Sequence, residues 1–484
     1  MNIRFSLHII GNFMKFLGLL MFVPAVISLF YKENDIWAFI ISALFTSSFG
    51  FILEIITKPK EHSKEIERKE GFLIAAMAWF AASLFGAIPY LIYGVFNNPI
   101  DAWFESVAGF TTTGATALVN IEALPNGILF WRSFSQWLGG MGIIVLGIAI
   151  LPRLAVGGMQ LMGLEAPGPT TEKITPRIAE TAKKLWGLYV FLSIVLVVIL
   201  LFAGMPAFDS VLQALSTLST GGFSPKNLSV GSYNSPLIDA IITVFMFIAG
   251  TNFVLLYWSL RGDLKKITKN SEFKFYLLIN LAVILVVSAE LWATIYPSIF
   301  EALRYGSFQV ISISTGSGFT TANYDIWPSF SKWFLLLLMF FGGCAGSTTG
   351  SIKIIRIMVL FKKGYQELHK IIYPRAVMPI RVNSKPISDD VVSSIASFFI
   401  IYLFIFLVST LVVMAAEDLP IITAISACAA SLGNVGPGLG QVGPIGNYSE
   451  LTSFTKFALS LLMIIGRLEL FTILVIFTPT FWRN

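Results

Sequence analysis

The chain has 484 residues, of which 56% are hydrophobic and 12% are charged, and its mean hydropathy is +0.78. Soluble domains carry about a quarter charged residues, so this composition excludes an ordinary water-soluble protein and indicates an integral membrane protein. The formal net charge of +6 is the kind of excess that orients a chain in a membrane, and no nucleic-acid partner is expected. Cys344 and Cys428 lie in or beside apolar stretches, so no disulfide framework is expected.

A spanning helix needs about 20 consecutive, mostly apolar residues. Windows of that length predict ten spans. The first apolar run is too long for a signal peptide and a second span follows it closely, so we expect the chain to keep it. The predicted spans are 10–31, 36–57, 71–94, 128–151, 184–204, 236–260, 275–296, 330–361, 391–415 and 454–480.

Basic residues gather in alternate loops between these spans. The loops 58–70, 153–184, 261–274 and 353–385 hold most of the 33 Lys and Arg residues. Because basic loops stay in the cytoplasm, we expect a multi-pass membrane protein. It would lie in the lipid bilayer with both termini cytoplasmic.

Each of the other long stretches contains a short apolar segment followed by a polar sequence with glycine. An apolar segment of about ten residues cannot cross the bilayer, so we expect it to enter the membrane and return. We call the four polar sequences the signatures. They are Thr111, Thr112, Thr113 and Gly114; Ser219, Thr220, Gly221 and Gly222; Thr315, Gly316, Ser317 and Gly318; and Gly433, Asn434, Val435 and Gly436.

The signatures recur at similar intervals and indicate an internal repeat of span, re-entrant segment and span. Four such repeats about one axis could enclose a pore, which a single repeat could not. The predicted units are two leading helices in 1–70, repeat 1 in 71–183 (pore loop 101–118), repeat 2 in 184–274 (pore loop 209–226), repeat 3 in 275–385 (pore loop 301–322, glycine-rich loop 342–351) and repeat 4 in 386–484 (pore loop 418–440).

The signatures have the chemistry of a cation path. Non-helical backbone at membrane depth is tolerated where it lines a watery cavity, and rings of carbonyl oxygens can replace the hydration shell of a cation. A single Gly/Thr cluster has a second interpretation, either as an interhelical loop or as a close-packing site. Acidic residues near the re-entrant segments would either gather cations or cap helices. They are Asp101, Glu105, Asp209, Glu301, Glu417 and Asp418.

Three further runs, "GGMGIIVLGIAILP" at 139–152, "GGCAGSTTGSIKIIR" at 342–356 and "GRLELFTILVIFTPTFW" at 466–482, accompany the signatures. Together they resemble the Trk-type potassium uptake transporters, the TrkH/TrkG branch of the Trk/Ktr/HKT superfamily. The resemblance covers essentially the whole chain. It implies an all-α membrane protein of ten transmembrane helices, in which two leading helices precede four linked, potassium-channel-like M1-P-M2 repeats around a central pore.

The resemblance also implies how such a protein works. The signature residues would bind potassium in a selectivity filter, with sodium as the alternative ion, because each signature has one clear glycine where potassium channels have TVGYG. The chain would act as a homodimer with a TrkA-like cytosolic nucleotide-binding ring. Nucleotide is therefore expected on that partner, and no covalently bound cofactor is expected on this chain.

The eighth predicted span is too long for one straight crossing and is rich in Gly, Ser and Thr at its centre, so its helix should break. The resemblance favours an intramembrane gate below the filter, with packing against another helix as the alternative. Arg467 inside the last span would add an electrostatic barrier, or else pair with Glu469 or another acid. Lys353 is expected at the cytoplasmic boundary. The gate residues are Gly342, Gly343, Gly346, Ser347, Thr348, Thr349, Gly350 and Arg467.

The function predicted is potassium uptake driven by the membrane potential, which at 100 mV supplies about 2.3 kcal/mol per monovalent cation. The chain has no Gly-x-x-x-x-Gly-Lys-Ser/Thr sequence for a nucleotide. A proton- or sodium-coupled symporter is the alternative, although the predicted spans hold few acids. An intramembrane enzyme is disfavoured, because the three histidines lie outside the re-entrant segments. The loops 153–184 and 353–385 could receive the cytosolic partner, or 165–184 could be a solvated interfacial helix.

Overall fold

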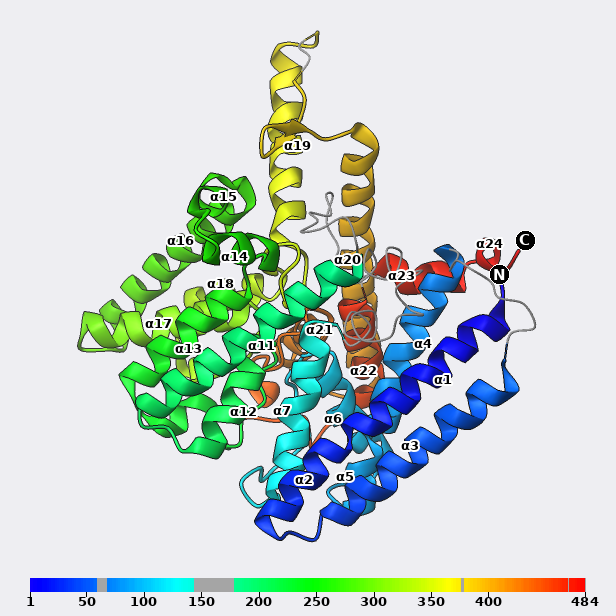
Figure 1. Cartoon of the computed structure of the whole chain (residues 1–484). Coiled ribbons are helices and arrows are strands. Elements are labelled where there is room, and N and C mark those ends of the chain that lie inside the picture. Colours follow the sequence, from blue (N-terminus) through cyan, green and yellow to red (C-terminus); the bar gives the residue numbers. More distant parts are fainter. Residues whose placement is uncertain (59–67, 143–177, 376–377, 469, 484) are drawn as a thin grey trace.

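The computed structural model describes residues 1–58, 68–142, 178–375, 378–468 and 470–483, and these are almost entirely helical (Figure 1). Within them, the strands β1 (Arg381–Val382) and β2 (Lys385–Pro386) form a two-residue antiparallel ladder. The remaining short elements are α15 (Leu264–Lys269), α24 (Pro479–Trp482), η1 (Ser229–Tyr233), η2 (Tyr324–Ile326) and η3 (Gly440–Val442).

The described part of the chain contains six helical stretches that are long and apolar enough to cross a membrane. The first begins at Ile3, seven residues before the predicted span, and two of the six join a pair of helices. The stretches are α1 (Ile3–Leu20) with α2 (Phe22–Tyr31), α3 (Ile36–Ile56), α4 (Arg68–Gly86) with α5 (Ile88–Tyr93), α11 (Ile178–Phe202), α16 (Ser271–Thr294) and α20 (Asp389–Ala416).

Two predicted straight spans, 236–260 and 454–480, are bent pairs of helices. In the first, α13 (Pro236–Ala249) and α14 (Phe253–Leu260) meet at 108°. Gly250 lies so close to the Tyr276 hydroxyl that a Cβ would collide with it, and the Asn252 side chain accepts a hydrogen bond from Val254 N at 2.8 Å to start α14. In the second, α22 (Ser453–Arg467) meets α23 (Leu470–Leu474) and η4 (Val475–Phe477) at 111°.

The predicted span 330–361 is also broken, as its Gly/Ser/Thr content indicated. Helix α18 (Ser329–Leu338) ends before the glycine run, and α19 (Ile354–Ile372) begins after it. Helix α7 (Asn126–Gly140) forms the start of the predicted span 128–151. The rest of that span, most of the loop 153–184 and the centre of the loop 58–70 lie outside the described residues.

Four short helices lie inside the bundle, and the signatures follow them. Residues Ala102–Phe110 of the first short helix are all buried. A helix buried on every side packs against protein rather than lipid. The predicted re-entrant segments are short helices, of which the first is covered by protein: α6 (Pro99–Phe110), α12 (Ala207–Leu218), α17 (Ile299–Ser314) and α21 (Ile421–Leu432).

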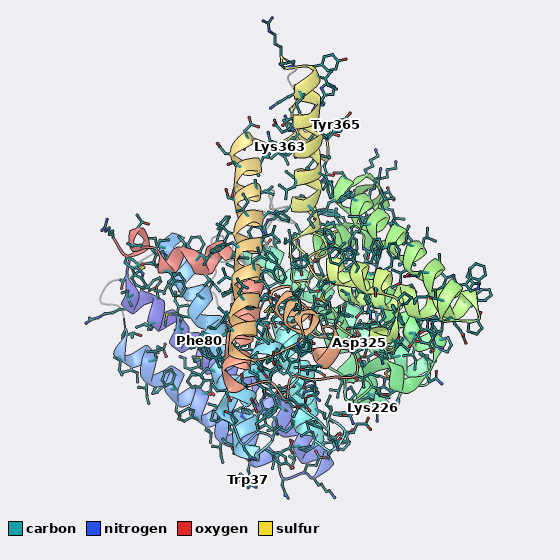
Figure 2. The ribbon with its side chains drawn as sticks, turned by 180° about the vertical axis from the view of Figure 1, so that it is seen from behind. Trp37, Phe80, Lys226, Asp325, Lys363 and Tyr365 are labelled. Carbon is teal, nitrogen blue, oxygen red and sulfur yellow. The ribbon has the colours of Figure 1, made fainter. Side chains whose placement is uncertain are left out.

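Helix α19 extends well beyond the helical body, beside the start of α20 (Figure 1). Figure 2 shows Lys363 and Tyr365 on this extension, with Trp37 at the opposite end of the molecule. Charged side chains alternate with exposed apolar ones there.

Candidate functional site

Each short helix ends in the same way, with a left-handed residue at the second position of its signature. The amide of the third position donates to a carbonyl five residues earlier, as Thr113 N does to Ala108 O at 2.9 Å, which is a Schellman helix end. A β-branched side chain rarely adopts this backbone, so Thr112 and Thr220 hold strain at a candidate functional site. The φ angles are +53° at Thr112, +54° at Thr220, +68° at Gly316 and +53° at Asn434.

The fourth position of each signature is a left-handed glycine that touches the next signature. A Cβ at any of these four positions would overlap a carbonyl oxygen across the contact, so both conformation and space require glycine there. The last contact joins the fourth signature to the first, and the four signatures therefore form a closed ring. The contacts are Gly114 with Gly221, Gly222 with Ser317, Gly318 with Val435, and Gly436 with Thr113.

The ring has features that suit a cation. Left-handed residues at alternate positions turn successive peptide groups so that carbonyl oxygens can face one axis, and such oxygens can replace the hydration shell of an ion. The four short helices end at the ring, and a helix C-terminus carries a partial negative charge. The arrangement thus offers negative partial charge to a cation without a carboxylate.

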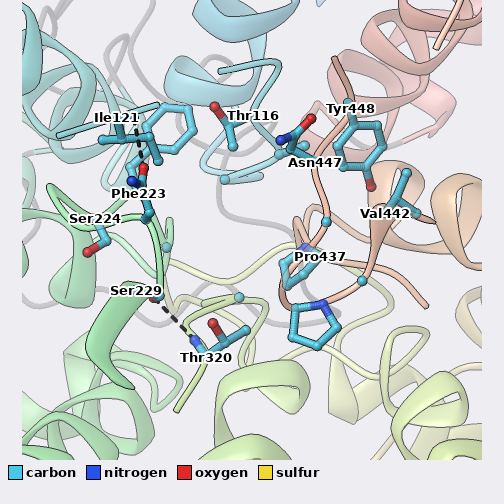
Figure 3. Close-up of a pocket in the computed structure, with 18 of the residues that line it drawn as sticks. Thr116, Ile121, Phe223, Ser224, Ser229, Thr320, Pro437, Val442, Asn447 and Tyr448 are labelled. Carbon is cyan, nitrogen blue, oxygen red and sulfur yellow. Dashed lines mark hydrogen bonds between the residues drawn. The ribbon is translucent and has the colours of Figure 1, made fainter. Parts of the chain in front are cut away.

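A cavity of about 80 Å³ opens on one side of the ring, and Figure 3 shows Thr116, Phe223, Thr320 and Pro437 around it. Residues from all four signatures or directly after them line it. None of the lining residues among the described part of the chain is acidic, whereas Arg132 and Lys226 are basic.

Two of the acidic residues near the short helices are held by side chains of α22 (Ser453–Arg467). Asp101 pairs with Lys456 at 2.9 Å, and Glu417 accepts a hydrogen bond from Thr455 at 2.8 Å. Asp101, Asp209 and Glu301 lie in the first turns of their helices, where a negative charge stabilises the helix dipole. Of the two interpretations of these acids, the structure favours helix stabilisation over the gathering of cations.

A buried ion pair that the sequence analysis did not single out braces the ring from outside. Arg132 Nε lies 2.9 Å from Glu105, and the two side chains are 2% and 0% exposed. Arg132 also donates to Ser224 O at 3.2 Å, and Glu105 accepts from Thr116 Oγ1 and Ala117 N at 3.0 Å. The pair therefore ties the segments after the first and second signatures together. An arginine inside a predicted span was the available signal.

Tyr448 supports the fourth signature beyond the ring. Its hydroxyl donates to Gly436 O at 2.8 Å, and its amide donates to Thr116 O at 2.9 Å. Burial raises the pKa of the Tyr448 phenol above its ordinary value, so the hydroxyl stays a donor at neutral pH. Tyr448 thus links the segments that follow the fourth and first signatures.

The loop between α18 and α19, which contains the predicted gate residues, lies against the helix ends at the ring. Thr348 Oγ1 donates to Leu218 O at 3.1 Å, and Ser351 Oγ donates to Gly433 O at 2.8 Å. These partners precede the glycines that line the cavity, so the loop and the cavity contact different ends of the signatures. The predicted gate residues Gly342, Gly343, Gly346, Ser347, Thr348, Thr349 and Gly350 all lie in this loop.

Arg467 lies at the bend after α22 and reaches both the ring and the loop. Its Nη1 donates to Thr112 Oγ1 at 3.1 Å and to Thr348 O at 2.8 Å. Its Nη2 donates to Gly139 O and Gly140 O at 2.5 and 2.8 Å. The alternative partner Glu469 lies outside the described residues. The guanidinium therefore binds carbonyl and hydroxyl oxygens of three separate segments.

Lys353, which is expected at the cytoplasmic boundary, belongs to the same loop and directly precedes α19. The side chain is buried, 5% exposed, and its ammonium donates to the carbonyl and hydroxyl oxygens of Thr349. Lys353 closely follows Gly350 in the sequence, so its side chain can fold back onto the loop. Lys353 is thus a second basic residue, after Arg467, whose side chain contacts the loop between α18 and α19.

Comparison with known proteins gives consistent matches. A family model described as the cation transport protein TrkH matches residues 37–483. The chain is 41% identical to the Trk system potassium uptake protein TrkH of Salmonella typhimurium, with 100% of each covered, and 35% identical to TrkG of Escherichia coli, with 100% and 99% covered. It is similar to the crystal structure of the potassium transporter TrkH from Vibrio parahaemolyticus, with a TM-score of 0.89 and 37% identity over 100% of both chains.

Proposed function

The chain belongs to the TrkH family of cation transport proteins, and on that premise we propose that it carries potassium ions across the cell inner membrane into the cytoplasm. It is a multi-pass membrane protein of a transport family and not an enzyme. Its relatives are named as potassium uptake proteins, which supports potassium as the ion. Sodium is the alternative cargo.

The observation that carries this proposal is the closed ring of signatures. Gly114 touches Gly221, and Gly436 touches Thr113 to complete the circle. A ring of backbone oxygens at the ends of four helices supplies ligands for a cation inside the membrane. No carboxylate has to be buried to bind the ion. In this proposal the sixteen signature residues form the selectivity filter, in which potassium is the transported substrate.

The closed ring also supports a proposed division of the chain into four repeats. Four units of the predicted type, 71–183, 184–274, 275–385 and 386–484, would surround one pore, after two leading helices in 1–70. Each unit contributes one short helix to the ring. The bends or breaks after α13, α18 and α22 come at a similar place in each of the last three units, as expected for related repeats.

The loop 342–351 and Arg467 would form the gate. The loop touches the second and fourth signatures through Thr348 and Ser351, and Arg467 joins the loop to Thr112. A positive charge beside the ion path repels a cation, and the loop narrows that path. Opening would require the loop to leave these partners.

The membrane potential would drive uptake, since 100 mV is worth about 2.3 kcal/mol per monovalent cation. The alternative is symport with protons or sodium on the same scaffold. Of the acids expected within spans, Glu54 is paired with Lys15, and Glu290 accepts a hydrogen bond from Ser331. Acids engaged in this way are less suited to proton coupling, which favours the uncoupled mechanism.

We also propose that the chain works as a homodimer with a TrkA-like cytosolic nucleotide-binding ring, and that nucleotide binds that partner. The extension of α19 carries exposed apolar side chains, with Phe361, Tyr365 and Leu368 at least 65% exposed. Exposed apolar patches mark interaction surfaces. Substitution of Phe361 by Glu, followed by measurement of the mass of the purified protein in detergent, tests whether this surface joins two copies.

Flux through purified protein in liposomes tests the function. The variants Gly222→Ser and Gly318→Ser place a side chain in the ring and should lose potassium flux or selectivity at least tenfold, the result of about 1.4 kcal/mol. Gly204→Ser is the matched control, because Gly204 has φ +89° and nothing within 4 Å of a Cβ. If both ring variants keep wild-type selectivity, the filter assignment is wrong.

The same liposomes separate the two mechanisms. Potassium uptake that follows the potassium gradient and the potential alone supports a conduit. Uptake that stops when the proton or sodium gradient is removed supports a symporter instead.

A further inference from the structure

Gln136 of α7 holds the second signature from behind with both ends of its amide. Its side chain is fully buried, 0% exposed. Nε2 donates to Gly221 O at 2.6 Å, and Oε1 accepts from Phe223 N at 3.0 Å. The amide therefore spans Gly222, the glycine that the second signature gives to the ring.

The contact explains why the second signature has two glycines in succession. A Cβ on Gly221 would lie 2.5 Å from Gln136 Oε1 and closer still to its Cδ. The corresponding residues of the other signatures are Thr113, Ser317 and Val435. The chain thus accommodates the amide of Gln136 at this position by omitting a side chain from the signature.

Gly221 O is also an oxygen of the ring itself, since it faces Gly114 of the first signature. A hydrogen bond from outside fixes the direction of this carbonyl and occupies one of its two lone pairs. Selection between potassium and sodium depends on the size of the cavity and on the field strength of its carbonyls. Holding the carbonyl in place opposes the inward movement that the smaller sodium ion requires.

We propose that Gln136 is a positioning residue that sets the discrimination between potassium and sodium by fixing Gly221 and Phe223. This inference rests on the proposed function. It adds that selectivity depends on a side chain of α7, outside the signatures. The same helix ends at Gly139 and Gly140, which accept hydrogen bonds from Arg467. Helix α7 is therefore in contact with both the ring and the gate residues.

Two substitutions at Gln136 test the inference, and a third provides a control. Q136M has a similar length but no hydrogen-bonding group, and Q136L fills a similar volume with a branched apolar side chain that also lacks the donor to Gly221 O. The control is Q309M, since Gln309 is also 0% exposed but donates to Thr321 Oγ1 at 3.3 Å, beyond the third signature.

The measurement is the ratio of potassium to sodium flux in liposomes at one potential, with the thermal unfolding midpoint as a measure of folding. We expect Q136M to lower the ratio at least about fivefold, the effect of one buried hydrogen bond. Q136L should lower it too, because the bond to Gly221 is lost there as well. Q309M should keep the ratio within about twofold of wild type, whatever its midpoint.

A wild-type ratio in folded Q136M overturns the inference, as does an equal loss in Q136M and Q309M. If Q136M yields no folded protein, Q136L decides, and a wild-type ratio there is equally contrary. Failure of the proposed function itself looks different, because the wild-type protein would then carry no potassium in the same liposomes.

Discussion

Arg467 and Thr348 are joined by a hydrogen bond of 2.8 Å, from Nη1 of the guanidinium to the carbonyl oxygen in the centre of the gate loop. The same nitrogen donates to Thr112 Oγ1 at 3.1 Å. One cationic group thus links the loop to the first signature. Its charge lies next to the proposed path of the ions.

Removal of this charge should increase potassium flux. A cation that passes about 8 Å from the guanidinium is repelled by about 2 kcal/mol at an effective dielectric constant of 20, which corresponds to roughly thirtyfold in rate. Arg467→Ala also frees the loop from Thr112. We expect a large rise in flux through liposomes that contain the purified chain alone.

Arg261→Ala is the control for this prediction, because Arg261 lies over the Tyr257 ring near the end of α14, far in sequence from the loop. Arg261→Ala removes one positive charge from the chain, as Arg467→Ala does. Equal flux from R467A and wild type would mean that the arginine does not restrict the ions.

The buried pair Glu105 and Arg132 should contribute strongly to stability, but only as a pair. Removal of one partner from a buried pair leaves an uncompensated charge and costs about 3–5 kcal/mol. We therefore expect Glu105→Gln alone to lower the thermal midpoint of the detergent-solubilised protein markedly. The double variant Glu105→Met, Arg132→Met should unfold at a higher temperature than the more damaging single variant.

The comparison of single and double variants decides whether the pair acts as a unit. Additive losses in the double variant would show that Glu105 and Arg132 contribute independently, for instance through the bonds of Glu105 to Thr116 and Ala117.

Local composition was enough to predict several elements of the fold. Short apolar segments predicted the helices α6, α12, α17 and α21, because their length is incompatible with a crossing. The run from Gly342 to Gly350 predicted the break between α18 and α19, because glycine destabilises the interior of a helix. Each of these signals is contained in a few neighbouring residues.

Other features depend on contacts between distant residues and escaped the sequence analysis. The lack of room for a side chain at Gly250, beside the bend, comes from the Tyr276 hydroxyl on another helix. The left-handed backbone at Thr112 is unfavourable for threonine taken alone, so no propensity indicates it. Gln136 lies 85 residues from Gly221 in the chain, and a polar residue within a predicted span was the one hint that it carried.

Glu272 should hold the gate loop to the hairpin formed by β1 and β2. It lies in the first turn of α16 and accepts a hydrogen bond from Ala345 N at 2.6 Å. The preceding residue, Ser271, donates its amide to Asn383 Oδ1 at 2.8 Å, between β1 and β2. One turn of helix thus connects the hairpin with the loop.

We expect Glu272→Ala to loosen the loop and raise potassium flux in liposomes about tenfold, for the loss of about 1.4 kcal/mol. Glu272→Gln keeps an acceptor oxygen for Ala345 N and should stay near wild type. If Gln raises flux as much as Ala, the charge of Glu272 and not its hydrogen bond controls the loop.

Asp35 should make the stability of the protein depend on pH. It lies in the turn between α2 and α3, is 0% exposed, and accepts a hydrogen bond from Ile128 N at 3.1 Å at the start of α7. Burial raises the pKa of the Asp35 carboxyl, and the nearby charge of Glu33 raises it further. The native state therefore binds this proton more tightly than the unfolded state does.

The sign of the effect follows from this difference. The stabilisation from protonated Asp35 is complete below the unfolded pKa of about 3.9 and is lost as the pH rises through the raised native pKa. Asp35→Asn stays neutral and keeps an oxygen for Ile128 N. The thermal midpoint of D35N should therefore rise relative to that of wild type between about pH 4 and pH 8.

The exposed carboxylate Asp263, which pairs with Lys266 at 3.4 Å, provides the control as Asp263→Asn. The thermal midpoint of D263N, relative to that of wild type, should change less over the same pH range than the midpoint of D35N does. A wild-type protein that gains stability over D35N as the pH rises would show that Asp35 is held as a charged group, and that its bond to Ile128 outweighs its burial.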